Sequence, residues 1–296
     1  MLRPTSHCSS PTSNRHGRVT DLHTDAYPEL SRTLRFFPLG VEAPRILTHE
    51  QIDHYNQYGY LSPLRVFTEA EVQPFREYFD DLLPRAMAAG WGNYDLTNWH
   101  KYCPDIYDLV THSRILDIIA DLIGETIILR HSHFFAKLPG DGMQVSWHQD
   151  ASYWPISPSR VVSAWLAIDD SDADNAALQV VPGSHKGGQV AFADSSDSEH
   201  NVLNQTVPNP SDYGAPVTLE LAAGEMSLHS DWTLHGSGRN MSRRRRCGLA
   251  MRFLAPGVTA HLGWNQHSIV CRGEDPAGHW ANNPRPETQA IPTRSG

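Results

Sequence analysis

Hydrophobic residues recur at helical spacing in three segments of the first half of the chain. The first apolar stripe begins after Thr48 and ends at Gly59, and the second begins after Thr68. A third amphipathic segment covers residues 113–123. Each of the two threonines has Gln or Glu three residues later, which is the pattern of a capping box at a helix start. We therefore predict three helices here, and we expect Pro74 to kink the second one or to displace its start.

Short apolar or alternating runs dominate from residue 127 onward. They have the lengths of strands, and Gly, Pro, Asn and Ser, which favour turns, lie between them. The expected strands cover residues 60–64, 127–138, 143–147, 161–168, 178–181, 217–221, 226–229 and 247–254. Helices followed by many short strands are typical of a mainly β fold with flanking helices, of the jelly-roll type.

Composition divides the chain into three parts. Residues 1–46 are rich in Ser, Thr, Pro and Arg and show little periodicity, so we predict an N-terminal extension that is partly disordered. Residues 47–256 hold the expected helices and strands and form the predicted jelly-roll domain. Residues 257–296 are rich in Gly, Pro, Asn and Arg, and we expect a C-terminal extension with short turns that packs on, or trails from, the same domain.

Composition and charge then exclude several classes of protein. The chain has 296 residues, 40% hydrophobic and 19% charged, as a soluble globular protein does. Its net charge of −9 gives no sign of a nucleic-acid partner, and no apolar run is long enough for a membrane span. The four cysteines form no C-x-x-C pair, which suits a reducing compartment. We predict a cytoplasmic protein, with organellar targeting by the basic N-terminus as the less favoured alternative, and the oligomeric state stays open.

His148 and Asp150, two residues apart, are the first candidate for chemistry, and His235 follows 85 residues after the aspartate. On a β-strand, side chains two apart lie on the same face. Two imidazoles and one carboxylate can hold one face of an octahedral Fe(II) and leave three positions open for substrates. A lone His-x-Asp or a lone His-Gly-Ser turn is a weak signal, but the two together, with a downstream arginine, are more specific. Because no cysteine lies near these motifs, Fe(II) is favoured over Zn(II).

These motifs resemble those of the phytanoyl-CoA dioxygenase family, a branch of the Fe(II)- and 2-oxoglutarate-dependent oxygenases. The resemblance rests on the stretches 147–150, 175–185 and 235–246 and runs from about Leu47 to Pro256. It implies a double-stranded β-helix, which is a cupin-like jelly roll, with Fe(II) at its open mouth and 2-oxoglutarate as the cosubstrate.

The resemblance also implies a role for each motif residue. His148, Asp150 and His235 would bind the iron. His229 is the rival for the last ligand, but a Gly-Ser pair follows His235, and Arg246 lies at the family's spacing from it. Arg246 would then bind the far carboxylate of 2-oxoglutarate, because a guanidinium offers a planar fork that always carries its charge.

Other residues are assigned to the surroundings of the iron on weaker grounds. Ser237 could donate a second hydrogen bond to the cosubstrate, and Arg252 is the alternative anchor for its carboxylate. His131 and Trp165 are candidates for the cosubstrate wall, although ordinary packing explains them equally well. The side chains assigned to the substrate pocket are Tyr153, Trp154, His133, His229 and Trp232. Each of these could instead be a core or rim residue.

Two further details bear on the family pattern. Residues 175–177 read Asn-Ala-Ala where the family usually has Asn-Gly, and since alanine is strained at positive φ, we expect this turn to be altered. Of the basic run 243–246, we interpret the first three arginines as a solvated turn. Some relatives that chlorinate carbon have a small residue at the carboxylate position, so Asp150 favours oxygenation.

The leading hypothesis is an Fe(II)- and 2-oxoglutarate-dependent dioxygenase that hydroxylates an unactivated C–H bond of a small molecule. It would convert 2-oxoglutarate and O₂ to succinate and CO₂. No polyphosphate-binding signature is present, and we favour a natural-product intermediate as the substrate. Desaturation, cyclisation and epimerisation share this chemistry and stay open. The alternative of another class is a jelly roll that binds a metal or ligand without catalysis, and succinate formation distinguishes the two.

Overall fold

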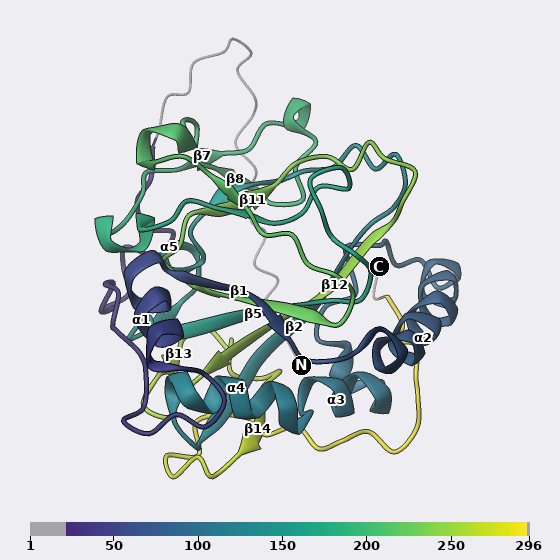
Figure 1. The fold of residues 1–296 in the computed structure, drawn as a ribbon, viewed down its shortest axis with the longest axis horizontal. Helices are drawn as coiled ribbons and strands as arrows, with labels where there is room; N and C mark the ends of the chain where they lie inside the picture. Colours follow the sequence, from purple (N-terminus) through teal and green to yellow (C-terminus); the bar gives the residue numbers. More distant parts are fainter. Residues whose placement is uncertain (1–21, 295–296) are drawn as a thin grey trace, which may run out of the picture.

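The computed structural model describes residues 22–294, so the basic stretch with Arg3, Arg15 and Arg18 lies outside it. Among the described residues, the major sheet has the strand order β1-β10-β5-β12-β2-β14, and the minor sheet has the order β3-β11-β6-β9. Neighbouring strands in both sheets come from distant parts of the chain and run antiparallel, as in a jelly roll. The predicted fold, mainly β with flanking helices, is confirmed (Figure 1).

The strands of the major sheet are β1 (Tyr60–Arg65), β2 (Ile127–Lys137), β5 (Val161–Ala167), β10 (Glu225–Ser230), β12 (Arg246–Leu254) and β14 (Ile269–Arg272). Those of the minor sheet are β3 (Val145–His148), β6 (Gln179–Val180), β9 (Val217–Thr218) and β11 (His235–Ser237). Two short pairs are β4 (Ile156–Ser157) with β13 (Thr259–Ala260) and β7 (Ala193–Asp194) with β8 (Gln205–Thr206).

The α-helices are α1 (His49–Tyr58), α2 (Glu69–Ala88), α3 (Pro104–Val110), α4 (Ser113–Ile123) and the short α5 (Asp150–Tyr153). Helices α2, α3 and α4 lie on one side of the major sheet, and β11 lies on the other side (Figure 1). The 3₁₀ turns are η1 (Trp99–Lys101), η2 (Ser184–Gly187), η3 (Asp197–Glu199) and η4 (Pro210–Tyr213). Within residues 22–294, none of the helices has both the length and the apolarity that a membrane crossing requires.

The two predicted capping boxes are present at the starts of α1 and α2. Thr48 accepts a hydrogen bond from the backbone N–H of Gln51, whose side chain accepts one from the N–H of Thr48. Thr68 and Glu71 form the same reciprocal pair at α2. Since α2 begins at Glu69 and continues through Pro74, the expectation that this proline displaces the helix start is wrong.

Strand β12 shows most clearly how the sequence divides core from cavity. Side chains alternate between the two faces of a strand. One face packs into the core that the helices cover, through Cys247, Leu249, Met251 and Phe253. The other face carries Arg246, Gly248, Ala250 and Arg252, of which the two arginines and the alanine line a cavity.

Some elements differ from the sequence-based expectation. The His-Gly-Ser stretch expected as a turn is strand β11. The segment after Pro256 contributes β14, an edge strand of the major sheet that pairs with β2. Short strands at the rim of a sheet have weak periodicity, which is why these elements were missed.

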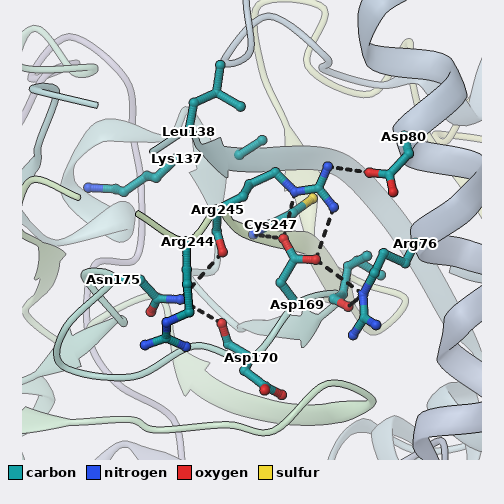
Figure 2. A network of polar contacts seen from close by, with 12 residues as sticks. Arg76, Asp80, Lys137, Leu138, Asp169, Asp170, Asn175, Arg244, Arg245 and Cys247 are labelled. Carbon is teal, nitrogen blue, oxygen red and sulfur yellow. Dashed lines mark hydrogen bonds and ion pairs between the residues drawn. The ribbon is translucent and has the colours of Figure 1, made fainter. Parts of the chain in front are cut away.

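Polar contacts fix the chain where it enters β12 (Figure 2). Arg245 donates from Nε to Oδ2 of Asp169 at 2.7 Å and from Nη2 to Oδ1 at 3.0 Å. The same carboxylate accepts the backbone N–H of Cys247 at 3.0 Å and lies 3.3 Å from Nε of Arg76 on α2. The interpretation of Arg245 as part of a solvated turn is therefore wrong, because this side chain clamps β12 to the end of β5.

The turn at residues 175–177 is closed, not altered. Asn175 is buried, its Oδ1 accepts the N–H of Asp172 at 2.8 Å, and its Nδ2 donates to the carbonyl of Asp170 at 2.8 Å. Ala177 completes the turn by donating its N–H to the carbonyl of Asp172 at 2.8 Å. Ala176 is thereby held at φ 67°, so the expectation of an altered turn is wrong. Ala176 therefore has a strained backbone conformation, in the left-handed region of φ and ψ.

Replacing this alanine should stabilise the protein. We expect Ala176→Gly to raise the free energy of unfolding by about 0.5–1 kcal/mol, because the left-handed strain of 1–2 kcal/mol exceeds the chain entropy that glycine adds to the unfolded state. Urea or thermal unfolding measures the change. Ala177→Gly, next to it but not at positive φ, is the matched control and should lower stability. If the free energy of unfolding fell equally in the two variants, Ala176 would not be strained.

Candidate metal and cosubstrate site

His148, Asp150 and His235 lie together at the open end of the minor sheet. His148 is the last residue of β3 and His235 the first of β11, and the register of these antiparallel strands places the two Cα atoms opposite each other. The imidazole rings are 4.1 Å apart between centroids. The three side chains are buried, and one ligand atom from each lies within 4.8 Å of the others. This cluster has the composition of a three-ligand metal site with open positions.

Backbone contacts set the orientation of both imidazoles. Nδ1 of His148 lies 2.7 Å from the carbonyl of Ser146, and Nδ1 of His235 lies 2.8 Å from the carbonyl of Thr233. Because a carbonyl only accepts, each Nδ1 carries the proton and each Nε2 keeps a free lone pair. Both Nε2 atoms face the carboxylate of Asp150, at 3.4 Å from His148 and 3.9 Å from His235. The lone pairs therefore converge where a cation would be bound.

The charge states also suit a divalent cation. Burial alone would raise the pKa of Asp150, but the contacts with His148 and His235 and the nearby charge of Arg252 lower it below its ordinary value. Burial holds the pKa of His235 well below its ordinary value. An ionised carboxylate beside a neutral imidazole is the state in which these groups coordinate metal.

Asp150 reaches this position in a way that the sequence did not predict. The expectation that it continues the strand of His148 is wrong, because the chain leaves β3 at Gln149 and Asp150 begins α5. Gln149 holds this corner, since its Nε2 donates to the carbonyl of Trp232 at 2.8 Å and its Oε1 accepts the N–H of Val190 at 2.8 Å. The corner turns the carboxylate toward the two imidazoles.

His229, the rival ligand, lies beside the cluster on β10. Its ring centroid is 4.5 Å from that of His235. Burial lowers its pKa to about 4, so it is neutral near neutral pH. The convergent group found among the described residues contains His148, Asp150 and His235 and does not include His229. His229 therefore forms part of the wall of the site.

A cavity of about 560 Å³ opens in front of the cluster and runs between the two sheets. Arg246 lies in its wall, and this side chain is 2% exposed. Its guanidinium carbon is 5.2 Å from the ring of Trp165 on the neighbouring strand β5. Gly248 makes room for that ring, because a Cβ atom there would lie 2.0 Å from Cζ2 of Trp165. Arginine, tryptophan and glycine thus form one packed unit.

Arg246 has features of a side chain that awaits an anionic ligand. Its Nε has no hydrogen-bond partner among the described residues. Burial lowers its pKa to about 10, which still leaves it charged near neutral pH. A buried cation with unused donors is costly unless a ligand satisfies it. A carboxylate of 2-oxoglutarate has the charge and the two acceptor oxygens that a guanidinium binds.

The remaining candidates fall into two groups. Ser237 at the end of β11 and His131 on β2 line the same cavity as Arg246 and Trp165, and so do the pocket candidates Tyr153, Trp154, His133 and His229. Trp232 is fully buried and is not among the described residues that line the cavity. Its backbone carbonyl, not its ring, supports the site through Gln149.

Several cavity residues were missed from the sequence, and Arg130 and Trp264 are two of them. Arg130 follows Leu129 on β2, where alternation predicts a side chain that faces away from His131. A bulge changes this, because Arg252 pairs with His131 and Phe253 pairs with Leu129, which leaves Arg130 as the extra residue. Trp264 lies in the C-terminal segment, whose composition gave no signal of a site, and it also lines the cavity.

Comparison with known proteins follows this geometry. The chain matches the model of the phytanoyl-CoA dioxygenase family over residues 55–248. It is 32% identical over 169 residues to a probable alpha-ketoglutarate-dependent hypophosphite dioxygenase of Stutzerimonas stutzeri, a match that covers 56% of this chain and 57% of that protein. It is 26% identical over 265 residues to the peroxisomal phytanoyl-CoA dioxygenase of Bos taurus, covering 80% of this chain and 77% of that protein.

A solved structure has the same fold. It is that of the non-heme monooxygenase ThoJ without ligand, with a TM-score of 0.66 and 23% sequence identity. The match covers 80% of this chain and 88% of that chain. The similarity shows that the two chains share a fold.

The assignment of the three ligands can be tested by metal binding. We expect His148→Ala and His235→Ala each to weaken Fe(II) or Co(II) binding by at least about a hundredfold, because loss of a supporting residue alone can cost up to that much. Isothermal titration under anaerobic conditions measures the affinity. His229→Ala, a buried histidine in contact with the cluster, is the matched control and should retain the metal. If His229→Ala abolishes binding and His235→Ala does not, the third ligand is assigned wrongly.

Proposed function

The chain belongs to the phytanoyl-CoA dioxygenase family of Fe(II)- and 2-oxoglutarate-dependent oxygenases, and on that premise we propose that it hydroxylates an unactivated C–H bond of a small molecule, such as a natural-product intermediate. The observation that carries the proposal is the shared cavity. The buried His-Asp-His cluster and the buried, incompletely bonded Arg246 line the same space. One part binds a metal, and the other binds a carboxylate.

Each residue has a defined task in this proposal. His148, Asp150 and His235 would hold Fe(II), which together with 2-oxoglutarate and O₂ supplies the oxidant and yields succinate and CO₂. Arg246 would bind the far carboxylate of 2-oxoglutarate by two charge-assisted hydrogen bonds. Ser237 lies at the end of the ligand strand β11 and would donate a further one.

The other cavity residues would place the substrate. His131 and Trp165 line the same cavity and would form the wall along the cosubstrate, with Trp165 against Arg246 and His131 opposite Arg252 in the sheet. Tyr153, Trp154 and His133 would orient the substrate's C–H bond, and the buried ligand cluster would limit the entry of water.

The proposal predicts a specific loss in Arg246→Ala. Removing one partner of a buried charge-assisted pair costs on the order of 2–5 kcal/mol. The KM for 2-oxoglutarate should therefore rise by roughly thirtyfold to several thousandfold. Metal affinity should change little, because Arg246 does not belong to the ligand cluster. Succinate formation at varied 2-oxoglutarate measures the effect. An unchanged KM here, with a collapse in Arg252→Ala, would move the role to Arg252.

Product analysis tests the reaction itself. Asp150 would occupy the coordination position that a halide needs, and its negative charge repels a second anion. In saturating chloride with ¹⁸O₂, we expect mass spectrometry to find a product with one ¹⁸O atom and no halogen. A halide isotope pattern would contradict the proposal. Loss of two hydrogens without ¹⁸O would replace hydroxylation by desaturation. Failure to form succinate, with metal and 2-oxoglutarate still bound, would favour a binding protein without catalysis.

A further inference from the structure

The cavity contains more positive charge than the iron and the cosubstrate require. Its described lining holds three arginines, Arg130, Arg246 and Arg252, but one carboxylate, Asp150. The charges of Fe(II) and of dianionic 2-oxoglutarate cancel each other. Two net positive charges therefore remain in a buried space after both have bound, and a buried charge without a partner is unfavourable.

Arg130 and Arg252 are the two cations left without a role. Both side chains are buried, at 4% and 9% exposure. Nε of Arg130, and both Nε and Nη1 of Arg252, have no hydrogen-bond partner among the described residues. Burial lowers the pKa of both groups, and for Arg130 the neighbouring charge of Arg252 lowers it further, to about 9. These donors are thus free to bind a ligand.

Aromatic rings hold the two guanidinium groups in place. The guanidinium of Arg130 lies between Trp154 and Trp264, at 4.5 Å and 4.8 Å from the ring centroids. That of Arg252 lies 5.8 Å from the rings of Trp154 and of Phe135. Trp154 therefore contacts both arginines, and it brings them together in one wall of the cavity.

This wall is separate from the proposed carboxylate anchor of the cosubstrate. Arg252 lies six residues beyond Arg246 on β12, which is about 20 Å along an extended strand. Between the two arginines the same face of β12 has Gly248, whose space the ring of Trp165 fills, and Ala250, which lines the cavity. The negative charge of Asp150 raises the pKa of Arg130 and of Arg252. It is not a cause of the pKa shift of Arg246. Arg130 and Arg252 therefore lie within the electrostatic reach of the ligand cluster.

We propose that Arg130 and Arg252 form the substrate-recognition site and that the substrate carries an oxyanion, a carboxylate or a phosphonate. The inference rests on the proposed oxygenase function, since it takes Arg246 to be used by 2-oxoglutarate. An oxyanion between the two guanidinium groups neutralises the excess charge and accepts their unused N–H donors. Trp154, Trp264 and Phe135 then surround the apolar part of the substrate.

The test uses the full chain with Mn(II) in place of Fe(II), saturated with N-oxalylglycine, an unreactive analogue of 2-oxoglutarate. Acetate, methylphosphonate and the neutral acetamide are titrated by calorimetry. We expect at least one anion to bind, and acetamide to bind at least about tenfold more weakly. The tighter of the two anions identifies the substrate as a carboxylate or a phosphonate.

Variants then assign the site. Arg130→Gln and Arg252→Gln should each weaken anion binding by at least about tenfold, whereas Arg252→Lys, which keeps the charge, should retain part of it. Arg285→Gln, which removes an exposed pair with Asp108, is the matched control and should bind anions as the wild type does. The affinity for N-oxalylglycine should change by less than about threefold in all four variants. Circular dichroism checks that each one is folded.

Several outcomes would overturn the inference. They are the absence of anion binding in the wild type, equal binding of acetamide, and undiminished anion binding in the double variant Arg130→Gln/Arg252→Gln. A loss of N-oxalylglycine affinity in Arg252→Gln as large as in Arg246→Gln would assign Arg252 to the cosubstrate instead. If the wild type fails to bind Mn(II) or N-oxalylglycine at all, the proposed function fails, and the two failures are distinguishable.

Discussion

The site depends on the alternation of side chains along β12. A residue of this strand either enters the core beneath the helices or faces the cavity, and a shift of one position would exchange the two sets. Cys247, Leu249, Met251 and Phe253 are apolar and fully buried in the core, so only one register is stable. The paired carboxylate contacts of Asp169 with Arg245 and with the N–H of Cys247 hold the start of the strand in that register. Because the next residue, Cys247, faces the core, Arg246 faces the cavity.

Electrostatics explains why the cavity needs its ligands. The described lining of the cavity contains three arginine side chains whose donors are incompletely satisfied, and its one carboxylate lies close to two imidazoles. A folded protein tolerates such groups when the stability of the surrounding core offsets their cost, and a ligand that satisfies them gains the corresponding affinity. The ring of Trp165 over Arg246 and those of Trp154 and Trp264 around Arg130 reduce this cost.

The sequence was most informative where a local pattern has one structural meaning. Capping boxes at Thr48 and Thr68 and the period of residues 113–123 gave the helices, because short-range contacts determine helix ends. The cluster of His148, Asp150 and His235 followed from a family pattern, and the structure brings these residues together. The start of α5 at Asp150 was not predicted from the sequence. A strand and a turn can both bring the side chains of residues two apart close together, and the corner at Gln149 depends on its contacts with distant segments.

The part of the site that depends on long-range strand pairing could not be predicted from the sequence. Arg130 faces the cavity because of a bulge that depends on how β2 pairs with β12, and no property of residues 127–137 alone indicates it. Trp264 reaches the cavity from a segment that composition marks only as irregular. The ring of Trp264 packs against the guanidinium of Arg130. The proposed recognition wall therefore consists of the elements that are hardest to predict from the sequence. The ligand cluster and Arg246 lie on regular strands, or directly after one, whose pairing the fold requires. Changes in the bulge or in the C-terminal segment can therefore alter the substrate while the metal and cosubstrate positions stay fixed.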